Sequence, residues 1–415
     1  MRSLTIFFFL FINFVQHSTA QKIAGFVVDL PNGNILDVPV SLHLDALTSL
    51  PDSTILLIEI TGAKRVPVPY QIENSSQRIL HFLIPQSSSD TKKRSFELIR
   101  GKPAGVEKKV WVENSDGALT ITSSGKNLLR YNYKLVYPAS GVDTIFKRSG
   151  FIHPLYAPHG QELTRVSPPD HYHHFGLWNP WTKVLVGTDT IDFWNLSTKK
   201  GFVRFAKTIS VSEGPVYADY QVLHEHVAFI NGQEIIAINE LQTVRIFNSG
   251  AGDYYIADIT IQLDCLPGRR VVLKEYRYGG LGWRATEKWD KTNSETLTSE
   301  GKTRKDADGS KARWCIVQGS LDNDYGGVVM MSYPTNYNFP EPLRIWPESM
   351  NGRGDVFANF SPTKDKDWEL TSGKHHVLRY RLLVFNGKFS SVKAEAAWKH
   401  FASGPGIIIR NKTSR

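Results

Sequence analysis

The sequence predicts an all-β protein, with a small N-terminal β-sandwich followed by a large antiparallel β-sandwich of the supersandwich type. Three observations lead to this class. Short runs of alternating apolar and polar residues recur along the chain, with turn residues between them. Glycine (32) and proline (21) are abundant, whereas methionine (4) is scarce. Only residues 392–401 show the periodicity of a helix.

The first twenty residues predict a secretory signal peptide. Arg2 supplies a positive start, an apolar run covers residues 6–15, and Ser18 and Ala20 place small residues before a cleavage site at Gln21. The run is too short to span a membrane, and no later segment reaches the roughly 18 apolar residues that a span requires. We therefore expect export to the periplasm and no membrane span.

Residues 21–125 predict the N-terminal β-sandwich domain. Residues 38–44 alternate between apolar and polar side chains, as a half-buried strand does. Residues 55–60 and 79–84 show similar apolar runs, and the polar residues 86–94 predict a loop. Short strands separated by turns are typical of a small sandwich.

Residues 126–415 predict the large domain, in which several strands are long. These strands are expected at residues 128–133, 203–211, 216–226, 234–247, 254–263, 271–278, 312–318, 327–332 and 377–385. Such strands fit antiparallel sheets stacked face to face. The polar residues 287–311 predict a mobile loop. Cys265 and Cys315 either form a disulfide or remain buried thiols, and the sequence leaves both open.

The chemistry-bearing side chains concentrate in residues 147–194. This segment holds five of the 13 histidines, and it is rich in arginine, tryptophan, proline and glycine. A loop of this composition has no evident packing purpose, so we expect an active or binding site here.

The side chains of this segment predict an anionic carbohydrate as the ligand. Imidazoles titrate near neutral pH and can act as general base and acid. Arginine and lysine bind carboxylates or sulfates, and tryptophan faces stack on sugar rings. The net charge of +9 also suits a polyanionic partner. Nucleic acid is not expected, because the chain is predicted to be exported and its basic residues form no stripe.

A metal site is the alternative for His171, His173 and His174, which stand at i, i+2 and i+3. On an extended strand His174 would face away from the other two, so a shared ion would require a turn. We therefore expect no metal and no cofactor, and keep the ion as the alternative. No carboxylate pair of the kind a glycosidase uses is evident.

Two stretches of the histidine-rich segment resemble the signature of the PmoA-like family, labelled "methane oxygenase PmoA" and largely of unknown function. They are residues 147–156 (KRSGFIHPLY) and 169–178 (PDHYHHFGLW). Residues 279–284 and 332–336 resemble later motifs of that family. Members occur in bacterial sugar-degradation loci, and a similar protein of ulvan-degradation loci is an oligosaccharide dehydratase. The sequence departs from the pattern at Phe175, where many members carry arginine, and at Tyr278, where a carboxylate is frequent.

The resemblance implies a lyase of the dehydratase type, which removes water from sulfated, ulvan-type oligosaccharides that carry an unsaturated uronic acid. His173 or His174 would take a ring proton, and His153, His171 or Tyr278 would protonate the departing hydroxyl. The residues expected to bind substrate are Lys147, Arg148, Arg165, Asp170, Trp178, Trp181, Arg284, Arg344 and Trp346. Two alternatives stay open: a glycan-cleaving polysaccharide lyase or glycoside hydrolase, and a non-catalytic module that binds anionic glycans.

Overall fold

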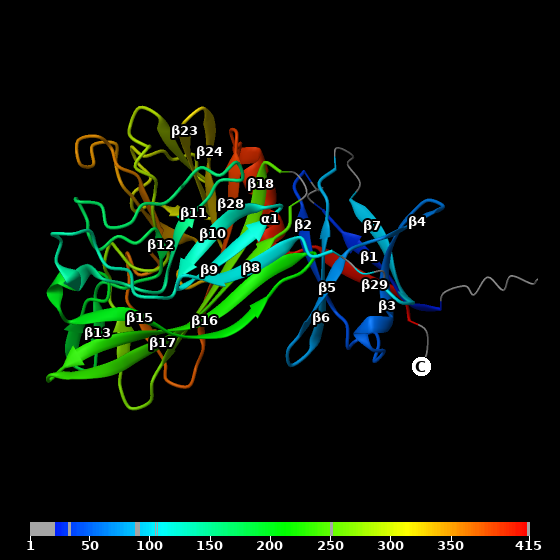
Figure 1. Cartoon of the computed structure of the whole chain (residues 1–415), viewed down its shortest axis with the longest axis horizontal. Helices are drawn as coiled ribbons and strands as arrows, with labels where there is room; N and C mark the ends of the chain where they lie inside the picture. The colour runs from blue at the N-terminus through cyan, green and yellow to red at the C-terminus, as the bar shows by residue number, and fades with distance from the viewer. Residues whose placement is uncertain are drawn as a thin grey trace, which may run out of the picture.

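The computed structural model describes residues 21–31, 35–87, 92–103, 105, 107–249 and 252–412. The predicted signal peptide lies outside these residues. The described chain forms a small and a large β-sandwich lobe, side by side along the long axis of the molecule (Figure 1). Within the described ranges, no helix is long and apolar enough to cross a membrane. The all-β prediction is confirmed.

The small lobe packs a five-stranded sheet against a three-stranded sheet. In spatial order, the five strands are β29 (Gly406–Lys412), β1 (Lys22–Asp29), β7 (Lys93–Arg100), β3 (Ile55–Thr61) and β4 (Lys64–Pro67). The three strands are β2 (Val38–His43), β6 (Arg78–Ile84) and β5 (Tyr70–Asn74). Phe26, Phe82 and Phe96 meet in the core between the sheets, with ring centroids 5.1 to 6.3 Å apart.

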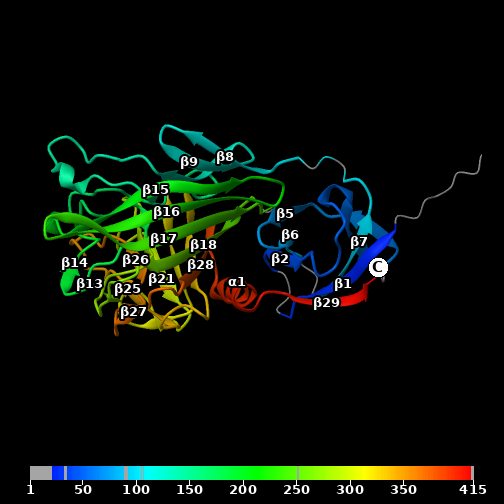
Figure 2. The same cartoon turned by 90° about the horizontal axis from the view of Figure 1, so that it is seen from below.

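The predicted domain boundaries need two corrections. The strands at residues 110–115 and 118–123 belong to the large lobe, so the first domain ends before Val110 rather than at residue 125. Strand β29, at the C-terminal end, pairs with β1 and so belongs to the small lobe (Figure 2). The second correction reflects pairing between strands far apart in the sequence, which leaves no periodic signal there, whereas β8 (Val110–Ser115) and β9 (Ala118–Ser123) simply pair in sequence order with β10 (Lys126–Asn132).

The large lobe stacks an eight-stranded sheet on a nine-stranded sheet. The eight strands are β15 (Gly201–Ser212), β16 (Tyr217–Ile230), β17 (Gln233–Phe247), β18 (Tyr254–Cys265), β28 (His376–Asn386), β24 (Asp324–Ser332), β23 (Trp314–Leu321) and β21 (Ser294–Thr298). The nine strands are β22 (Lys311–Ala312), β25 (Glu341–Ile345), β26 (Phe357–Phe360), β20 (Gly282–Arg284), β12 (Leu177–Trp178), β11 (Phe151–Leu155), β10 (Lys126–Asn132), β9 (Ala118–Ser123) and β8 (Val110–Ser115).

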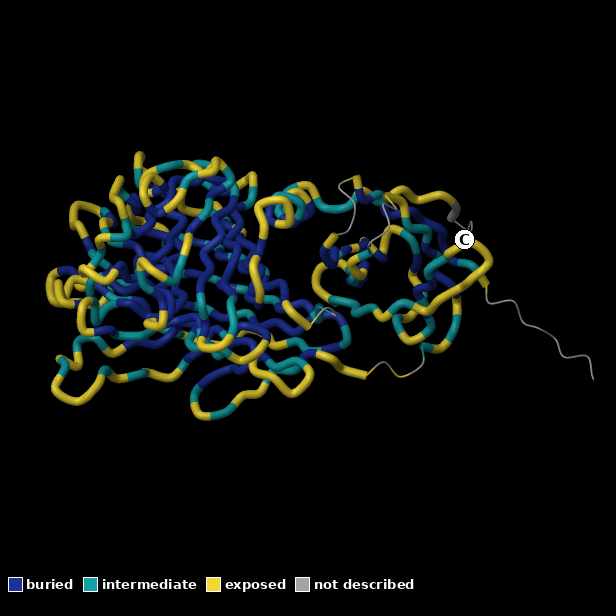
Figure 3. The backbone as a smooth tube through the Cα atoms, turned by 90° about the horizontal axis from the view of Figure 1, so that it is seen from above, coloured by how far each residue is buried: buried dark blue, intermediate teal, exposed yellow. Residues whose placement is uncertain are grey.

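The core of the large lobe follows from strand alternation. In β18, Ile259, Ile261 and Leu263 are buried between the sheets and alternate with partly exposed polar residues. The start of this strand, at Tyr254 and Ile256, is buried on its other face as well, because a helix covers it there. The buried backbone lies in the interior of each lobe (Figure 3).

The covering element is α1 (Ser391–Ser403), which confirms the helix predicted at residues 392–401. Ser390 caps its first turn by accepting a hydrogen bond from the Lys393 amide. Ala394 and Ala397 on its inner face pack against the eight-stranded sheet.

Residues 287–311 are not the free loop that their polarity predicts. They contain β21 and bury Trp289 and Arg304. The guanidinium of Arg304 donates to backbone carbonyls, among them those of Trp346 and Asp355, which satisfies a buried charge within a polar segment. Cys265 and Cys315 are buried free thiols.

A small four-stranded sheet closes one end of the large lobe. Its strands are β14 (Asp189–Ile191), β13 (Val184–Val186), β19 (Val271–Leu273) and β27 (Trp368–Leu370). Short 3-10 turns occur at Asp52–Thr54, Thr144–Phe146 and Leu196–Thr198.

Candidate functional site

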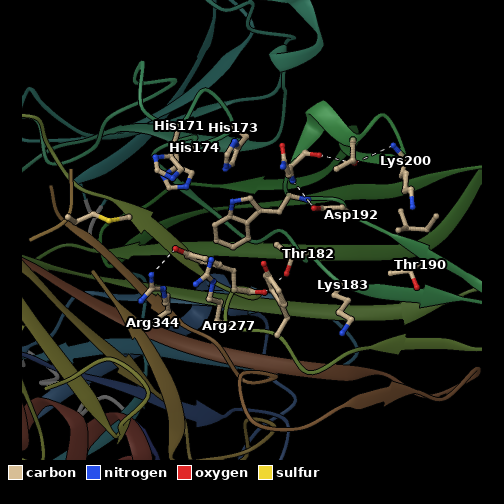
Figure 4. Close-up of a pocket in the computed structure, with 17 residues that line it drawn as sticks. His171, His173, His174, Thr182, Lys183, Thr190, Asp192, Lys200, Arg277 and Arg344 are labelled. Carbon is tan, nitrogen blue, oxygen red and sulfur yellow. Dashed lines mark hydrogen bonds between the residues drawn. The ribbon is translucent and has the colours of Figure 1, made fainter. Parts of the chain in front are cut away.

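A cavity of about 690 Å³ lies beside this small sheet and contains three of the predicted histidines. Its functional lining is formed by the imidazoles of His171, His173 and His174, the cations Lys183, Lys200, Arg277 and Arg344, the aromatic rings of Trp194, Tyr276 and Tyr278, and the carboxylate of Asp192. The three imidazoles lie on one side of the cavity, and Arg277 and Arg344 lie across from them (Figure 4).

Neighbouring strands of the nine-stranded sheet position this site. Strands β25, β26, β20 and β12 are adjacent in that order. Arg344 lies on β25, β20 follows Tyr278, and β12 follows His174. The pairing Leu177↔Trp283 therefore brings the histidine loop next to the segment of Tyr278, about 100 residues further along the chain.

A tight turn carries the three imidazoles to one point. The amide of His171 donates to the Pro168 carbonyl at 2.9 Å, and the amide of His174 donates to the His171 carbonyl at 3.0 Å. Gly176 ends the turn with φ +62°, and a Cβ there would lie 2.3 Å from the Ile152 carbonyl oxygen. The turn removes the geometric objection to a shared ion, which held for an extended strand.

Asp170 orients the ring of His171. Its carboxylate lies 2.8 Å from His171 Nδ1 and 2.9 Å from Arg284 Nη2, and it accepts from Asn351 Nδ2 at 2.9 Å. Burial alone would raise the pKa of Asp170, but the hydrogen bond from His171 and the charge of Arg284 outweigh it and lower the pKa. The charged carboxylate holds the proton on Nδ1, so Nε2 of His171 is left as the acceptor.

His174 is buried in an aromatic box. Its ring centroid lies 5.2 to 5.4 Å from those of Phe357, Trp178 and Trp346. Its Nδ1 is buried and has no hydrogen-bond partner among the described residues. Burial, with the neighbouring imidazoles and Arg284, lowers the pKa of His174 well below its usual value, so the ring is neutral.

His173 lies next to both rings, with centroids 5.4 Å from His171 and 5.0 Å from His174. Burial is the main cause that lowers the pKa of His173 to about 4, and the neighbouring His171 adds to it. His173 is partly exposed and lines the cavity. It therefore presents a neutral imidazole to a ligand at pH 7.

Tyr278 presents a phenol to the same cavity. Its hydroxyl oxygen accepts hydrogen bonds from Arg344 Nη2 and from Trp346 Nε1, both at 3.0 Å. Because two donors occupy the oxygen, the hydroxyl proton is directed away from them. Tyr278 can therefore give a proton to a bound ligand.

Asp192 is the carboxylate among these lining side chains. Its Oδ1 accepts from the amides of Trp194 and Asn195, both at 2.8 Å. Burial raises the pKa of Asp192 to about 6, against the opposing effect of the two amide hydrogen bonds. Four cationic side chains thus face one carboxylate whose charge is lost in mild acid.

Several predicted residues do meet at the cavity. His171, His173, His174, Tyr278 and Arg344 line it. Asp170, Arg284 and Trp346 lie behind them and hold their rings and charges. The Arg284 guanidinium is buried 4.6 Å from the centroid of the Trp346 ring, and it pairs with Asp170 and Asp355.

Three predicted residues are absent from the lining of this cavity. His153 lies 3.0 Å from the Thr164 hydroxyl and 3.3 Å from Glu162, so its ring is held elsewhere. Lys147 is exposed and lies over the Tyr137 ring. Arg165 pairs with Glu287 and Asp355. These three side chains therefore lie outside this cavity, and their roles in catalysis and binding stay predictions.

Three further residues are buried in the core. Trp178 and Trp181 are each 1% exposed, so neither offers a face to a sugar. Arg148 is 2% exposed, and its charge interacts with the buried carboxylate of Glu240. Burial lowers the pKa of Arg148 to about 10. The predicted stacking of Trp178 and Trp181 on a sugar is wrong because residue type alone does not separate a core tryptophan from an exposed one, whereas the binding role of Arg148 stays a prediction.

The sequence does not predict the cations Lys183, Lys200 and Arg277 of this cavity. In the sequence, Lys183 and Lys200 flank β13 and β14 of the small sheet, and Thr190 and Asp192 lie between these two lysines. Arg277 follows β19 of the same sheet. One signal was present: Arg277 precedes Tyr278 directly, so a candidate phenol had a cationic neighbour.

Comparison with known proteins places the chain in a family. A family model described as a family of unknown function, DUF6807, matches residues 118–399. The chain belongs to the DUF6807 family. The matched residues include every side chain that lines the cavity. No curated protein matches this DUF6807 chain.

Two solved structures from Enterococcus faecalis are similar to this DUF6807 member. One is described as an alpha-mannosidase of strain V583, and the other as a protein in glycosyl hydrolase family 38. Each is 10% identical with a TM-score of 0.45, and each match covers 95% of this chain. The chain spans about half of their length, 47% and 49% respectively.

Proposed function

We propose that this protein is a carbohydrate-active lyase, a dehydratase that removes one water from anionic oligosaccharides carrying an unsaturated uronic acid of the sulfated, ulvan type. The observation that carries the proposal is the composition of the cavity. Three imidazoles and two phenols face one space whose charged side chains are four cations and one carboxylate. The resemblance of residues 147–156 and 169–178 to the PmoA-like family supports the same reaction.

The cavity favours elimination over hydrolysis. A glycosidase of the common type needs two carboxyl groups flanking the scissile bond. Within the described residues, Asp192 is the one carboxylate that lines the cavity. Elimination instead needs a base, an acid and cations that hold developing negative charge, and the cavity supplies all three.

The reaction divides between the two sides of the cavity. Arg277 and Arg344 bind the uronate carboxylate or a sulfate through charge-assisted hydrogen bonds. A base at the imidazole cluster takes a ring C–H proton, and the electron pair of that bond forms the new double bond. The neighbouring C–O bond breaks, and the hydroxyl leaves as water with the proton of Tyr278. The rings of Trp194 and Tyr276 offer apolar faces to the sugar.

The proposed location is the periplasm. The apolar run at residues 6–15 and the small residues before Gln21 support it. A periplasmic enzyme would meet oligosaccharides after their import and before their breakdown to single sugars.

The test is a mass spectrum of ulvan-lyase oligosaccharides incubated with the purified protein. We expect the loss of one water with the chain length unchanged. Arg277→Gln should raise KM about tenfold, the effect of a lost charge-assisted contact. The matched control is Arg269→Gln, since Arg269 is exposed and outside the cavity lining. Shorter fragments would overturn the proposal in favour of chain cleavage, and saturable binding without a product would identify a binding module.

A further inference from the structure

We propose that His171, His173 and His174 form a site for one divalent transition-metal ion of the zinc class, open toward the cavity. Each ring offers one nitrogen, and the three nitrogens lie within 4.8 Å of one another. A tetrahedral zinc site with bonds of about 2.1 Å separates its nitrogens by about 3.4 Å. Small rotations of the rings bring the nitrogens to this shorter separation. The ring of His173 is free to rotate because it has no hydrogen bond among the described residues.

The environment of His171 matches that of a metal-bound imidazole. Ligating histidines usually donate their other ring N–H to a carboxylate, which fixes the tautomer and strengthens the ligand. Asp170 accepts this bond at 2.8 Å, and the buried Arg284 and the exposed Asn351 hold Asp170 in place. Nε2 of His171 is thereby left with its lone pair for the ion.

The buried ring of His174 lacks a partner that an ion would supply. The side chain is 1% exposed, and its Nδ1 has no hydrogen-bond partner in the described part of the chain. Aromatic rings surround it, and none of them is a strong acceptor or donor toward it. A buried polar ring left in this state is unfavourable, whereas a ring nitrogen bound to a cation is satisfied.

The donor set selects the class of ion. Three imidazoles and no carboxylate suit Zn²⁺ and its transition-metal neighbours, whereas Mg²⁺ and Ca²⁺ prefer oxygen ligands. Three protein ligands with a fourth position open to a cavity is the arrangement of a catalytic zinc site. All three histidines line the cavity, so the open position faces the ligand.

The existence of the site is independent of the proposed reaction, whereas its part in that reaction rests on the proposed function. Zinc lowers the pKa of bound water to about 7, so hydroxide is available at neutral pH. This hydroxide takes the ring C–H proton and becomes water. The double bond forms, the C–O bond breaks, and the leaving hydroxyl takes the proton of Tyr278. Solvent then returns a proton to Tyr278 and removes one from the bound water.

The test is metal binding by the purified protein after treatment with a chelator and dialysis, without any oligosaccharide. Calorimetric titration with Zn²⁺ should give one ion per chain, and Co²⁺ should give the strong visible bands of a tetrahedral site. His171→Gln and His173→Gln should each weaken Zn²⁺ binding more than about 100-fold, and Asp170→Asn about 10- to 100-fold. The matched control is His159→Gln, because His159 is exposed and pairs with Asp324 instead.

Two results would overturn the site: no binding of Zn²⁺ or Co²⁺ by the wild-type protein, or unchanged binding by both histidine variants. His171 and His173 are only partly buried, and a thermal melt of each metal-free variant checks that it is folded. Full dehydration by metal-free protein would refute the hydroxide base and leave the proposed function standing. Zinc bound at these histidines without any loss of water would refute the proposed function and leave the site standing.

Discussion

The Tyr278 hydroxyl and the Arg344 guanidinium form a hydrogen bond of 3.0 Å at the wall of the cavity. Arg344 is anchored from behind by Asp308, whose carboxylate lies 2.7 Å from Nη1. The guanidinium also lies 4.9 Å from the centroid of the Tyr278 ring. Arg344 therefore fixes the direction of the phenol, and the cation beside the oxygen stabilises negative charge after the proton has left.

The first prediction is that Tyr278→Phe lowers kcat for water removal by about 10²- to 10⁴-fold, the usual contribution of a positioned general acid. The ring is retained, so KM should change little. Initial rates measured by mass spectrometry on ulvan-lyase oligosaccharides check this prediction.

The matched control is Tyr276→Phe. Tyr276 lines the same cavity, but its hydroxyl has no hydrogen-bond partner among the described residues, so kcat should not change. An equal loss of kcat in both variants would contradict the role given to Tyr278, since the loss would then not depend on the hydroxyl that Arg344 and Trp346 orient.

The second prediction concerns binding and pH. The pKa of Asp192 is raised to about 6, so its negative charge is lost as the pH falls through that value and the cavity becomes more positive. Affinity for an anionic oligosaccharide should then rise about threefold to tenfold, the size expected for one charge in a partly solvated site. Calorimetry from pH 7.5 to pH 5 with the Tyr278→Phe variant measures binding without turnover.

Asp192→Asn is the matching control, because the amide oxygen can still accept the backbone bonds of Trp194 and Asn195. The difference in affinity between Tyr278→Phe and the same variant carrying Asp192→Asn as well should be present at pH 7.5 and vanish at pH 5. A difference that is constant over this range would show that the charge of Asp192 does not change there.

The sequence predicts the fold class and one side of the site. Alternation in β18 and the helical period of α1 are local signals, and both elements form where they are expected. The sequence indicates the histidine segment because its composition is costly in a core. It does not predict the turn that brings His174 beside His171, since that turn depends on the close approach of Gly176 to the Ile152 carbonyl of a neighbouring strand.

The other side of the site follows from long-range pairing, which one sequence does not reveal. Arg277 meets the histidines because β20 pairs with β12, and Lys183 meets them through the small sheet. Trp181 illustrates the reverse error: it was expected to face a sugar but packs at 6.1 Å against Trp368 in the core. Burial of a tryptophan depends on which strand arrives beside it.

The third prediction is a stability effect at Glu341. This carboxyl is fully buried and accepts hydrogen bonds from Ser332, Asn336 and Tyr380 at 2.6 to 2.9 Å. Burial nevertheless raises its pKa to about 7. In the unfolded chain the pKa is near its usual value, so between about pH 4.5 and 7 the folded state holds more protons and stability falls as the pH rises.

The expected fall over that range is about 3 kcal/mol in the free energy of unfolding. Urea denaturation of wild type and Glu341→Gln at several pH values isolates this fall. Subtracting one free energy of unfolding from the other cancels the contribution of the other titrating groups. The exposed Glu275→Gln should reproduce the wild-type slope. If wild type and Glu341→Gln showed parallel slopes, the assignment to this carboxyl would be wrong.

The fourth prediction concerns the contact between the two lobes, where Glu73 of β5 meets Arg245 of β17 at 2.7 Å. A hydrogen bond from His81 and the charge of Arg245 outweigh burial and lower the pKa of Glu73 to about 2. The folded state therefore favours the charged carboxylate. Its stabilising effect is complete above pH 4.5 and is lost as the pH falls toward 2.

Glu73→Gln should lower the free energy of unfolding at pH 7 by about 1–2 kcal/mol, a value reduced for the partial exposure of the pair. The gap between the two proteins should close as the pH falls from 4.5 toward 2, because the wild-type carboxylate is then protonated as well. Urea denaturation at pH 7, 4 and 3 measures it. Glu107→Gln is the control, since Glu107 is exposed and pairs only with Lys109 among the described residues, so the free energy of unfolding should stay at the wild-type value. A gap that stayed constant down to pH 3 would show that the carboxylate charge does not hold the lobes together.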